Sequence, residues 1–173
     1  MKVLYDYQIF LNQSYGGPSR YFYNLVKEVS KFQSVSICAP FHINNYLENL
    51  PKDNVDGFKI DNFFFNNSPH RFKELIKNKF LNKVNYYLQK KKISIFKPDL
   101  IHRTYFENYK TDLPVVLTVY DLIHEKFYES YDKKENYRPK KAAIDRADQI
   151  ICISKNTLKD LNYYYDLKNK KTK

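Results

Sequence analysis

The sequence predicts an α/β fold: a single, doubly wound and mostly parallel sheet with helices on both faces. Short continuous apolar runs alternate along the chain with longer segments whose apolar residues recur at helical spacing. A double glycine, Gly16-Gly17, separates the first apolar run from the first helical segment. Polar clusters follow several of the later runs, as expected where parallel strands end at one edge of a sheet. Together these observations are typical of a doubly wound sheet.

The predicted strands are short apolar runs, the pattern typical of strands that are buried on both faces of a parallel sheet. They span residues 2–9, 35–39, 58–64, 100–102, 115–119 and 149–153. Residues 41–69, which include the third run, are rich in Asn and Asp and have no sustained period. For that stretch we expect irregular structure with one short helix near Tyr46.

The predicted helices span residues 19–32, 71–92, 133–147 and 155–165. The second of them carries a run of apolar residues at helical spacing, namely Phe72, Leu75, Ile76, Phe80, Val84, Tyr87 and Leu88. Ser154 is the predicted N-cap of the last helix. Right-handed crossovers between such helices and strands would place ligands at the carboxyl ends of the strands.

Composition excludes a disordered chain, because 43% of the 173 residues are hydrophobic. The formal net charge of +11 is compatible with nucleic acid, anionic lipid or phosphorylated ligands. However, Lys, Asn, Ile, Tyr and Phe are abundant together, which fits a coding bias toward AT-rich codons, and the lysines are spread along the chain. We therefore favour a solvated basic surface over a dedicated polyanion site.

The two cysteines, Cys38 and Cys152, end apolar runs and lack metal-ligand spacing, so we expect core residues in a reducing cytosol. The chain has no signal-peptide pattern and no run of about 18 apolar residues, which predicts a cytoplasmic protein without a transmembrane helix. The predicted organisation is one domain over residues 1–166, followed by a basic, frayed tail over residues 167–173.

Four polar clusters follow predicted strands and form the candidate site. The first is Gly16-Gly17, which brings backbone N–H groups to a helix N-terminus where phosphate groups bind. Arg20 lies in the first turn of that helix, an unfavourable place for a cation unless an anion is near. The other clusters contain His102, then Tyr120, Asp121 and His124, and finally Ser154.

Each cluster also has a purely structural interpretation. The double glycine is common in tight turns, both histidines fit ordinary loop positions, and Asp121 and Ser154 are good capping residues. No Gly-x-Gly-x-x-Gly pattern occurs, so a dinucleotide-binding fingerprint is not supported.

Four runs of the chain resemble the N-terminal domain of family 4 glycosyltransferases of the two-domain GT-B architecture. They are YGGPSRYF at 15–22, DLIH at 99–102, PVVLTVYDLIHE at 114–125 and ADQIICISKNT at 147–157. Their order and spacing hold from Met1 to about residue 166. The resemblance implies a Rossmann-like domain that binds the acceptor and closes over the phosphates of the donor.

By this resemblance, Gly16 and Gly17 approach the donor diphosphate and Arg20 contributes beside them. Tyr120 faces the transferred sugar and, with Asp121, is a catalytic candidate. His102, His124 and Ser154 are candidates for substrate or phosphate binding. The implied reaction is sugar transfer from a nucleotide sugar to a glycan or lipid-linked acceptor, with retention and without a metal or other cofactor.

Three departures from the family pattern bear on activity. The family usually has His where Tyr120 stands, and a phenol cannot replace an imidazole near neutral pH. Pro18 stands where Ile is more frequent, a change that suits the first turn of a helix. The family's paired glutamates, separated by seven residues, do not occur in this chain, and Asp-x-Asp is also absent.

We therefore expect an acceptor-side half of a glycosyltransferase that lacks the C-terminal donor domain and is inactive unless another chain supplies it. A non-enzymatic remnant or binding module of the same fold is the alternative, and a basic nucleic-acid-binding α/β domain is a remote one. Tyr105, Phe106, Phe127 and Tyr128 would form an exposed apolar patch. A partner chain or the inner face of the membrane would cover this patch.

Overall fold

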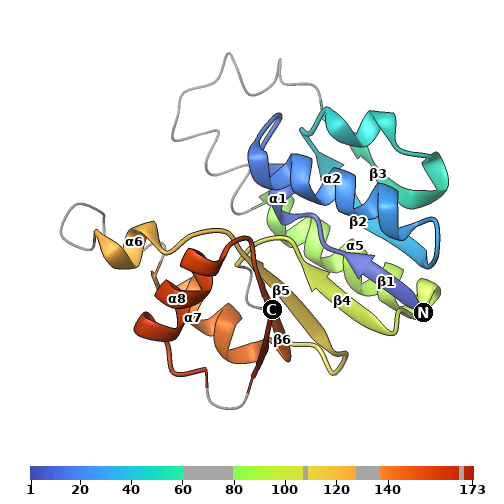
Figure 1. The fold of residues 1–173 in the computed structure, drawn as a ribbon. Helices are drawn as coiled ribbons and strands as arrows, with labels where there is room; N and C mark the ends of the chain where they lie inside the picture. The colour runs from blue at the N-terminus through green and yellow to red at the C-terminus, as the bar shows by residue number, and fades with distance from the viewer. Residues whose placement is uncertain (61–79, 107–108, 128–136, 168–169) are drawn as a thin grey trace. The chain divides into compact units, whose positions relative to one another are not determined.

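The structure is a computed structural model that describes residues 1–60, 80–106, 109–127, 137–167 and 170–173. The chain divides into two compact units, Met1–Asp99 and Leu100–Lys173 (Figure 1). In both units, helices alternate with strands, and every strand pairing within a unit is parallel. The predicted α/β, Rossmann-like class is therefore confirmed.

The first unit contains a three-stranded sheet in the order β3-β2-β1. Its elements are β1 (Lys2–Tyr5), α1 (Gln8–Asn12), α2 (Gly17–Val29), β2 (Ser34–His42), η1 (Tyr46–Asn49), η2 (Lys52–Asn54), β3 (Val55–Lys59) and α5 (Asn82–Phe96). The short helix near Tyr46 is confirmed as η1, a 3₁₀ helix. The first strand was predicted to reach residue 9 but ends at Tyr5, because the apolar run continues as the buried helix α1. Periodicity alone does not separate a buried strand from a short buried helix.

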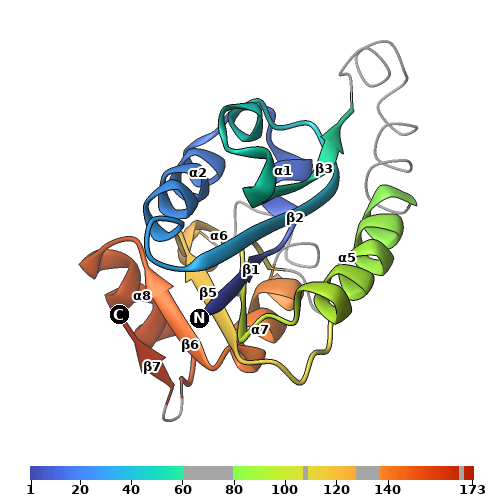
Figure 2. The ribbon, with the colours of Figure 1, turned by 90° about the vertical axis from the view of Figure 1, so that its right-hand side faces the viewer.

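An irregularity in β2 ties this sheet to α5, which Figure 2 shows running beside it. The pairing of β2 with β3 shifts register between Cys38 and Phe41, around Pro40, which has no N–H to donate. The Asn85 side chain of α5 accepts a hydrogen bond from Phe41 N (2.8 Å) and donates one to Phe41 O (2.9 Å). This side chain therefore satisfies backbone groups where the register shifts.

The buried face of α5 differs from the apolar face that was predicted. Residues 71–79 of that predicted helix lie outside the described part of the chain. In the described part, Phe80 and Tyr87 are 63% and 73% exposed, whereas the polar residues Asn85 and Gln89 are buried. The need to satisfy the irregular strand backbone thus outweighs the apolar pattern on this face.

The second unit contains four parallel strands in the order β4-β5-β6-β7. Its elements are β4 (Leu100–Arg103), β5 (Val115–Val119), α6 (Ile123–Lys126), α7 (Tyr137–Arg146), β6 (Gln149–Cys152), α8 (Lys155–Tyr164) and β7 (Lys171–Thr172). Its core joins β5, α7, β6 and α8 through Leu117, Ala143, Ile144, Ile150 and Leu161, all of which are fully buried.

Two further predictions concern the end of the chain and the membrane. The predicted fraying of the tail is wrong for Lys171 and Thr172, which pair with β6, and Lys173 N donates to Ile150 O at 3.0 Å. Lysine side chains do not prevent this pairing, because strand hydrogen bonds use only backbone groups.

None of the helices within the described ranges is long and apolar enough to span a membrane.

Candidate functional site

A chain of hydrogen bonds runs along the carboxyl ends of β4, β5 and β6. The Tyr120 hydroxyl donates to Thr104 O at 3.3 Å, and the Thr157 hydroxyl donates to Tyr120 O at 3.1 Å. The Ser154 and Thr157 hydroxyl oxygens lie 3.0 Å apart. Two of the predicted site residues, Tyr120 and Ser154, are thus linked through Thr157.

Thr157 was missed by the sequence analysis. Ser154 caps α8 by accepting a hydrogen bond from Thr157 N at 3.1 Å, which confirms its predicted capping role. The spacing Ser-x-x-Thr at the start of a helix could have predicted this contact. The side chain of an N-cap residue accepts a hydrogen bond from the backbone N–H of the third residue after it.

Asp121 follows β5 with its side chain exposed to solvent. Its Oδ1 accepts a hydrogen bond from Ile123 N at 3.2 Å, so the carboxylate closes the turn into α6. Asp121 thus has the capping role that its structural interpretation predicted. Burial, and secondly the nearby Asp121 carboxylate, raise the pKa of the Tyr105 phenol. This edge therefore presents a carboxylate close to a phenol that stays neutral at physiological pH.

A buried ion pair lies behind this turn. Lys140 Nζ is 2.9 Å from Glu125 Oε2, and these side chains are only 2% and 1% exposed. The Tyr165 hydroxyl donates to Glu125 Oε1 at 2.6 Å, and Lys140 Nζ donates to the backbone carbonyl of Asp121 at 3.3 Å. The network thereby fixes the Asp121 backbone between α6 and α7. Sequence reasoning missed it, because nothing in the spacing of two charged residues signals burial.

The two predicted histidines lie in different environments. His124 is half-buried on α6. His102 lies on β4, is 5% exposed, and its Nε2 is 2.9 Å from the Thr118 hydroxyl oxygen. Burial lowers the pKa of His102 to about 3, so its imidazole is neutral. A direct phosphate contact by His102 gains no support from this placement.

The glycine turn belongs to the first unit. Gln13 Oε1 accepts a hydrogen bond from Ser19 N at 3.3 Å, and a Cβ on Gly16 would lie 2.2 Å from the same oxygen. Gly17 is exposed with open space at its Cβ position, and Arg20 is exposed one turn later. A side chain at position 16 would meet only the flexible end of Gln13, which can move aside, whereas Gly17 leaves the approach to the N-terminus of α2 open.

The predicted aromatic patch is partly internal. Tyr105 and Phe106 are half-buried with ring centroids 4.6 Å apart, and Phe106 packs against the core of the second unit. Phe127 is 54% exposed, and Tyr128 lies outside the described residues. The described part of the patch therefore exposes mainly Phe127.

No metal site is found within the described ranges, because no three side chains of His, Cys, Asp or Glu lie close enough together there to hold an ion. Cys38 is a buried free thiol whose pKa burial raises to about 12, and Cys152 is a half-buried free thiol. Both are thiols that resist ionisation.

Comparison with known proteins bears directly on this arrangement. The family model described as Glycosyltransferase Family 4 matches residues 15–173. The chain belongs to glycosyltransferase family 4. No curated protein and no solved structure matches the chain in the same comparisons.

The family match includes all the predicted site residues. It identifies the chain as the type of domain that forms the N-terminal domain of GT-B glycosyltransferases. Gly16, Gly17 and Arg20 come from the unit Met1–Asp99, and the other candidates come from the unit Leu100–Lys173. Such a domain binds nucleotide sugars and acceptors in general, and the roles of individual residues stay predictions.

Proposed function

We propose that this chain is the acceptor-side part of a glycosyltransferase that moves a sugar from a nucleotide sugar to a glycan or lipid-linked acceptor, with retention and without a metal. The observation that carries the proposal is the hydrogen-bonded edge Thr104–Tyr120–Thr157–Ser154, which lies within the family match. A cytoplasmic chain that touches the inner membrane face through Phe127 would suit a lipid-linked acceptor.

The residues at this edge have chemistry suited to sugar binding. The Tyr120 hydroxyl donates to Thr104 O, which holds the phenol at the same edge as the hydroxyl groups of Ser154 and Thr157. The exposed Asp121 carboxylate is a strong acceptor for a sugar hydroxyl. In the other unit, the open N-terminus of α2 at Gly17 and the Arg20 cation suit the diphosphate of the donor.

The proposed sugar transfer needs donor-binding residues that these 173 residues do not contain. The family's paired glutamates are absent from the sequence, and in the family they belong to the domain that holds most donor contacts. We therefore expect that the chain supplied alone binds substrates but transfers no sugar. Donor-binding residues supplied in cis or in trans would complete the site.

The test measures nucleotide release from nucleotide sugars by the chain alone and after mixing with a family 4 donor domain. We expect release only in the mixture. Tyr120→Phe, which removes the hydroxyl, should lower release by about tenfold, the effect of one lost charged or buried hydrogen bond. Tyr163→Phe, at an 81% exposed tyrosine on α8, is the matched control. Efficient sugar transfer by the chain alone would contradict the proposal.

A non-enzymatic binding module of the same fold is the second candidate, and Tyr120 in place of the family's His favours it. The two candidates differ in the response to Tyr120→His. For a domain that completes an active enzyme, this variant keeps or raises turnover in the mixture. For a binding module, neither the native chain nor the variant shows turnover with any donor domain, although acceptor binding persists.

A further inference from the structure

A groove of about 270 Å³ lies within the first unit, and the residues that line it come from β2, β3 and α5. Its volume is near the lower end of the range for pockets that hold small molecules. The groove is therefore suited to one slender ligand rather than to a lipid with two chains.

The strand backbone shapes the floor of this groove. The pairing of β2 with β3 shifts register between Cys38 and Phe41. Beside this irregularity, Gly57 has a φ of 157°, and a Cβ there would clash with the carbonyl oxygen of Ala39. Only glycine fits such a position, so residue 57 adds no side chain to the groove. The hydrogen bonds of Asn85 to the Phe41 backbone hold α5 against the strand and fix the two walls.

Large apolar side chains form the walls. Phe58 of β3 and Ile95 of α5 line the groove although they are 77% and 69% exposed. Phe41 and Leu88 also line it and are half-buried. An alkyl chain in the groove would therefore remove apolar surface from water on both the strand side and the helix side.

The charged residues of the lining leave one cation available. Lys92 Nζ of α5 is 3.2 Å from Asp56 Oδ2 of β3, so these two charges balance each other. Lys91 is exposed, and it has no ion pair or hydrogen bond within the part of the chain that the structure describes. Charge complementarity therefore favours a ligand that carries one negative group.

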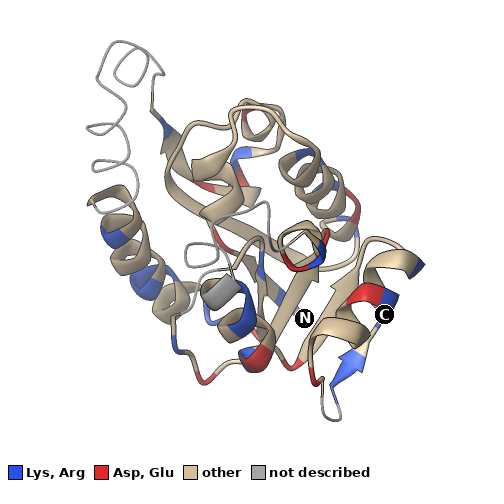
Figure 3. Ribbon diagram, turned by 90° about the vertical axis from the view of Figure 1, so that its left-hand side faces the viewer, with Lys and Arg blue, Asp and Glu red and all other residues tan. Residues whose placement is uncertain are grey.

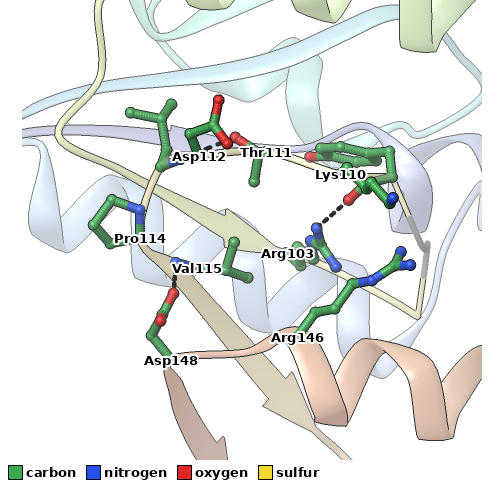
Figure 4. A pocket seen from close by; sticks show the side chains of 10 residues that line it. Arg103, Lys110, Thr111, Asp112, Pro114, Val115, Arg146 and Asp148 are labelled. Atoms are coloured by element: carbon green, nitrogen blue, oxygen red, sulfur yellow. Dashed lines mark hydrogen bonds between the residues drawn. The ribbon is translucent and has the colours of Figure 1, made fainter.

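A larger pocket, of about 470 Å³, lies in the second unit (Figure 4) and differs in character. Its polar groups are engaged within the protein. Arg103 Nη2 donates to Tyr109 O at 2.6 Å, and Asp148 Oδ2 accepts a hydrogen bond from Val115 N at 2.7 Å. These contacts tie β4 and β5 to neighbouring segments, so they support the fold.

We propose that the groove of the first unit binds a single-chain anionic lipid, namely a medium-chain carboxylate. Leu88, Lys91 and Ile95 lie on one face of α5, because they are spaced by three and four residues. The alkyl chain would lie against Leu88 and Ile95, with the carboxylate at Lys91. Each CH₂ group that enters the groove should raise the affinity about fourfold. This site is separate from sugar transfer, and its occupancy does not depend on the proposed function.

The test is a titration of the ¹⁵N-labelled, full 173-residue chain with hexanoate, octanoate and hexan-1-ol, followed by backbone amide shifts. We expect octanoate to shift the amides of residues 56–58, 88, 91 and 95, and to bind about 16-fold more tightly than hexanoate, which is two CH₂ groups shorter. Hexanoate should bind more tightly than hexan-1-ol, because only hexanoate carries a charge.

Three results would overturn the proposal. Equal affinity for hexanoate and hexan-1-ol would show that the groove does not recognise an anion. Shifts confined to the second unit, or no shifts, would show that the groove is not a ligand site. Shifts of the same groove amides when the chain alone is diluted would show that a second copy covers the groove.

Substitutions at exposed positions of α5 test the two halves of the site with little risk to folding. Lys91→Gln should abolish the preference for hexanoate over hexan-1-ol, whereas Lys90→Gln, at an exposed lysine outside the lining, should preserve it. Ile95→Ser should weaken octanoate binding about tenfold through the lost apolar contact. Tyr87→Ser, at a 73% exposed residue outside the lining, should change the affinity less than twofold. Equal effects within either pair of variants would reject a site in this groove.

Discussion

His102 and His42 show how burial sets the charge of a residue in this protein. Each lies in a sheet, and burial lowers the pKa of His102 to about 3 and that of His42 to about 4. His42 Nδ1 also accepts a hydrogen bond from Asn44 N at 3.2 Å. Sequence spacing correctly placed His102 at the end of a strand, but it could not show that the imidazole points into the protein and bonds Thr118.

These lowered pKa values predict a pH-dependent stability. The unfolded chain takes up protons on both histidines below about pH 6.5, whereas the folded chain does not until about pH 3–4. The stabilising contribution of the two neutral histidines should therefore be complete above about pH 6.5. Below that pH, the free energy of unfolding should fall by about 1.4 kcal/mol per pH unit for each histidine. Urea unfolding at pH 7, 6 and 5 measures this slope.

His102→Gln should remove about half of that slope, because His42 continues to titrate. If the variant and the native chain lost stability equally between pH 7 and pH 5, His102 would not be the group responsible. Carboxylates contribute mainly below this window, since their ordinary pKa values are near 4.

At the scale of elements, β5 was predicted with its observed bounds because a buried parallel strand has a clear apolar signature. The beginning of the chain was less predictable, since the same apolar signature continues into α1. The buried side of α5 was predictable only in part. Asn85 is buried because it meets the backbone of Phe41, a partner 44 residues away that no local pattern reveals.

The ion pair Glu125–Lys140 links α6 to α7 and gives a second prediction. Lys140→Met leaves the Glu125 carboxylate buried without its cation and should lower the free energy of unfolding by about 3–5 kcal/mol. Lys141→Met is the matched control, because the Lys141 side chain, paired with Asp145, is 51% exposed. This substitution should lower the free energy of unfolding by less than about 1 kcal/mol. Chemical denaturation measures both.

The double variant Glu125→Leu/Lys140→Met should recover most of the lost stability, since it removes both charges together. It also separates the ion pair from simple packing. A double variant that is no more stable than Lys140→Met would contradict the assignment of the loss to an uncompensated charge.

At the scale of the whole molecule, the net charge of +11 is dispersed rather than gathered into one element. Figure 3 shows Lys and Arg on helices and strands of both units. Several of these cations have acidic partners, including Lys31 with Glu28, Lys92 with Asp56 and Lys126 with Asp160. Such a surface attracts polyanions weakly and without sequence preference.

We therefore predict that a fluorescent DNA duplex binds the chain at about 20 mM salt and is released by about 200 mM salt, with no preference among duplex sequences. Fluorescence anisotropy across the salt range measures this. Retention of one duplex sequence at about 500 mM salt would contradict a dispersed surface and would favour the nucleic-acid-binding alternative.

The short strand β7 has a consequence for building larger proteins from this chain. Because β7 runs parallel to β6, and Cys152 N donates to Lys173 O at 2.8 Å, the polypeptide leaves the sheet on the side where β6 continues to Ser154. Any segment fused after Lys173 thus starts at the edge that carries the candidate sugar site. A catalytic partner is therefore best joined there through a short linker, and an affinity tag is better placed before Met1.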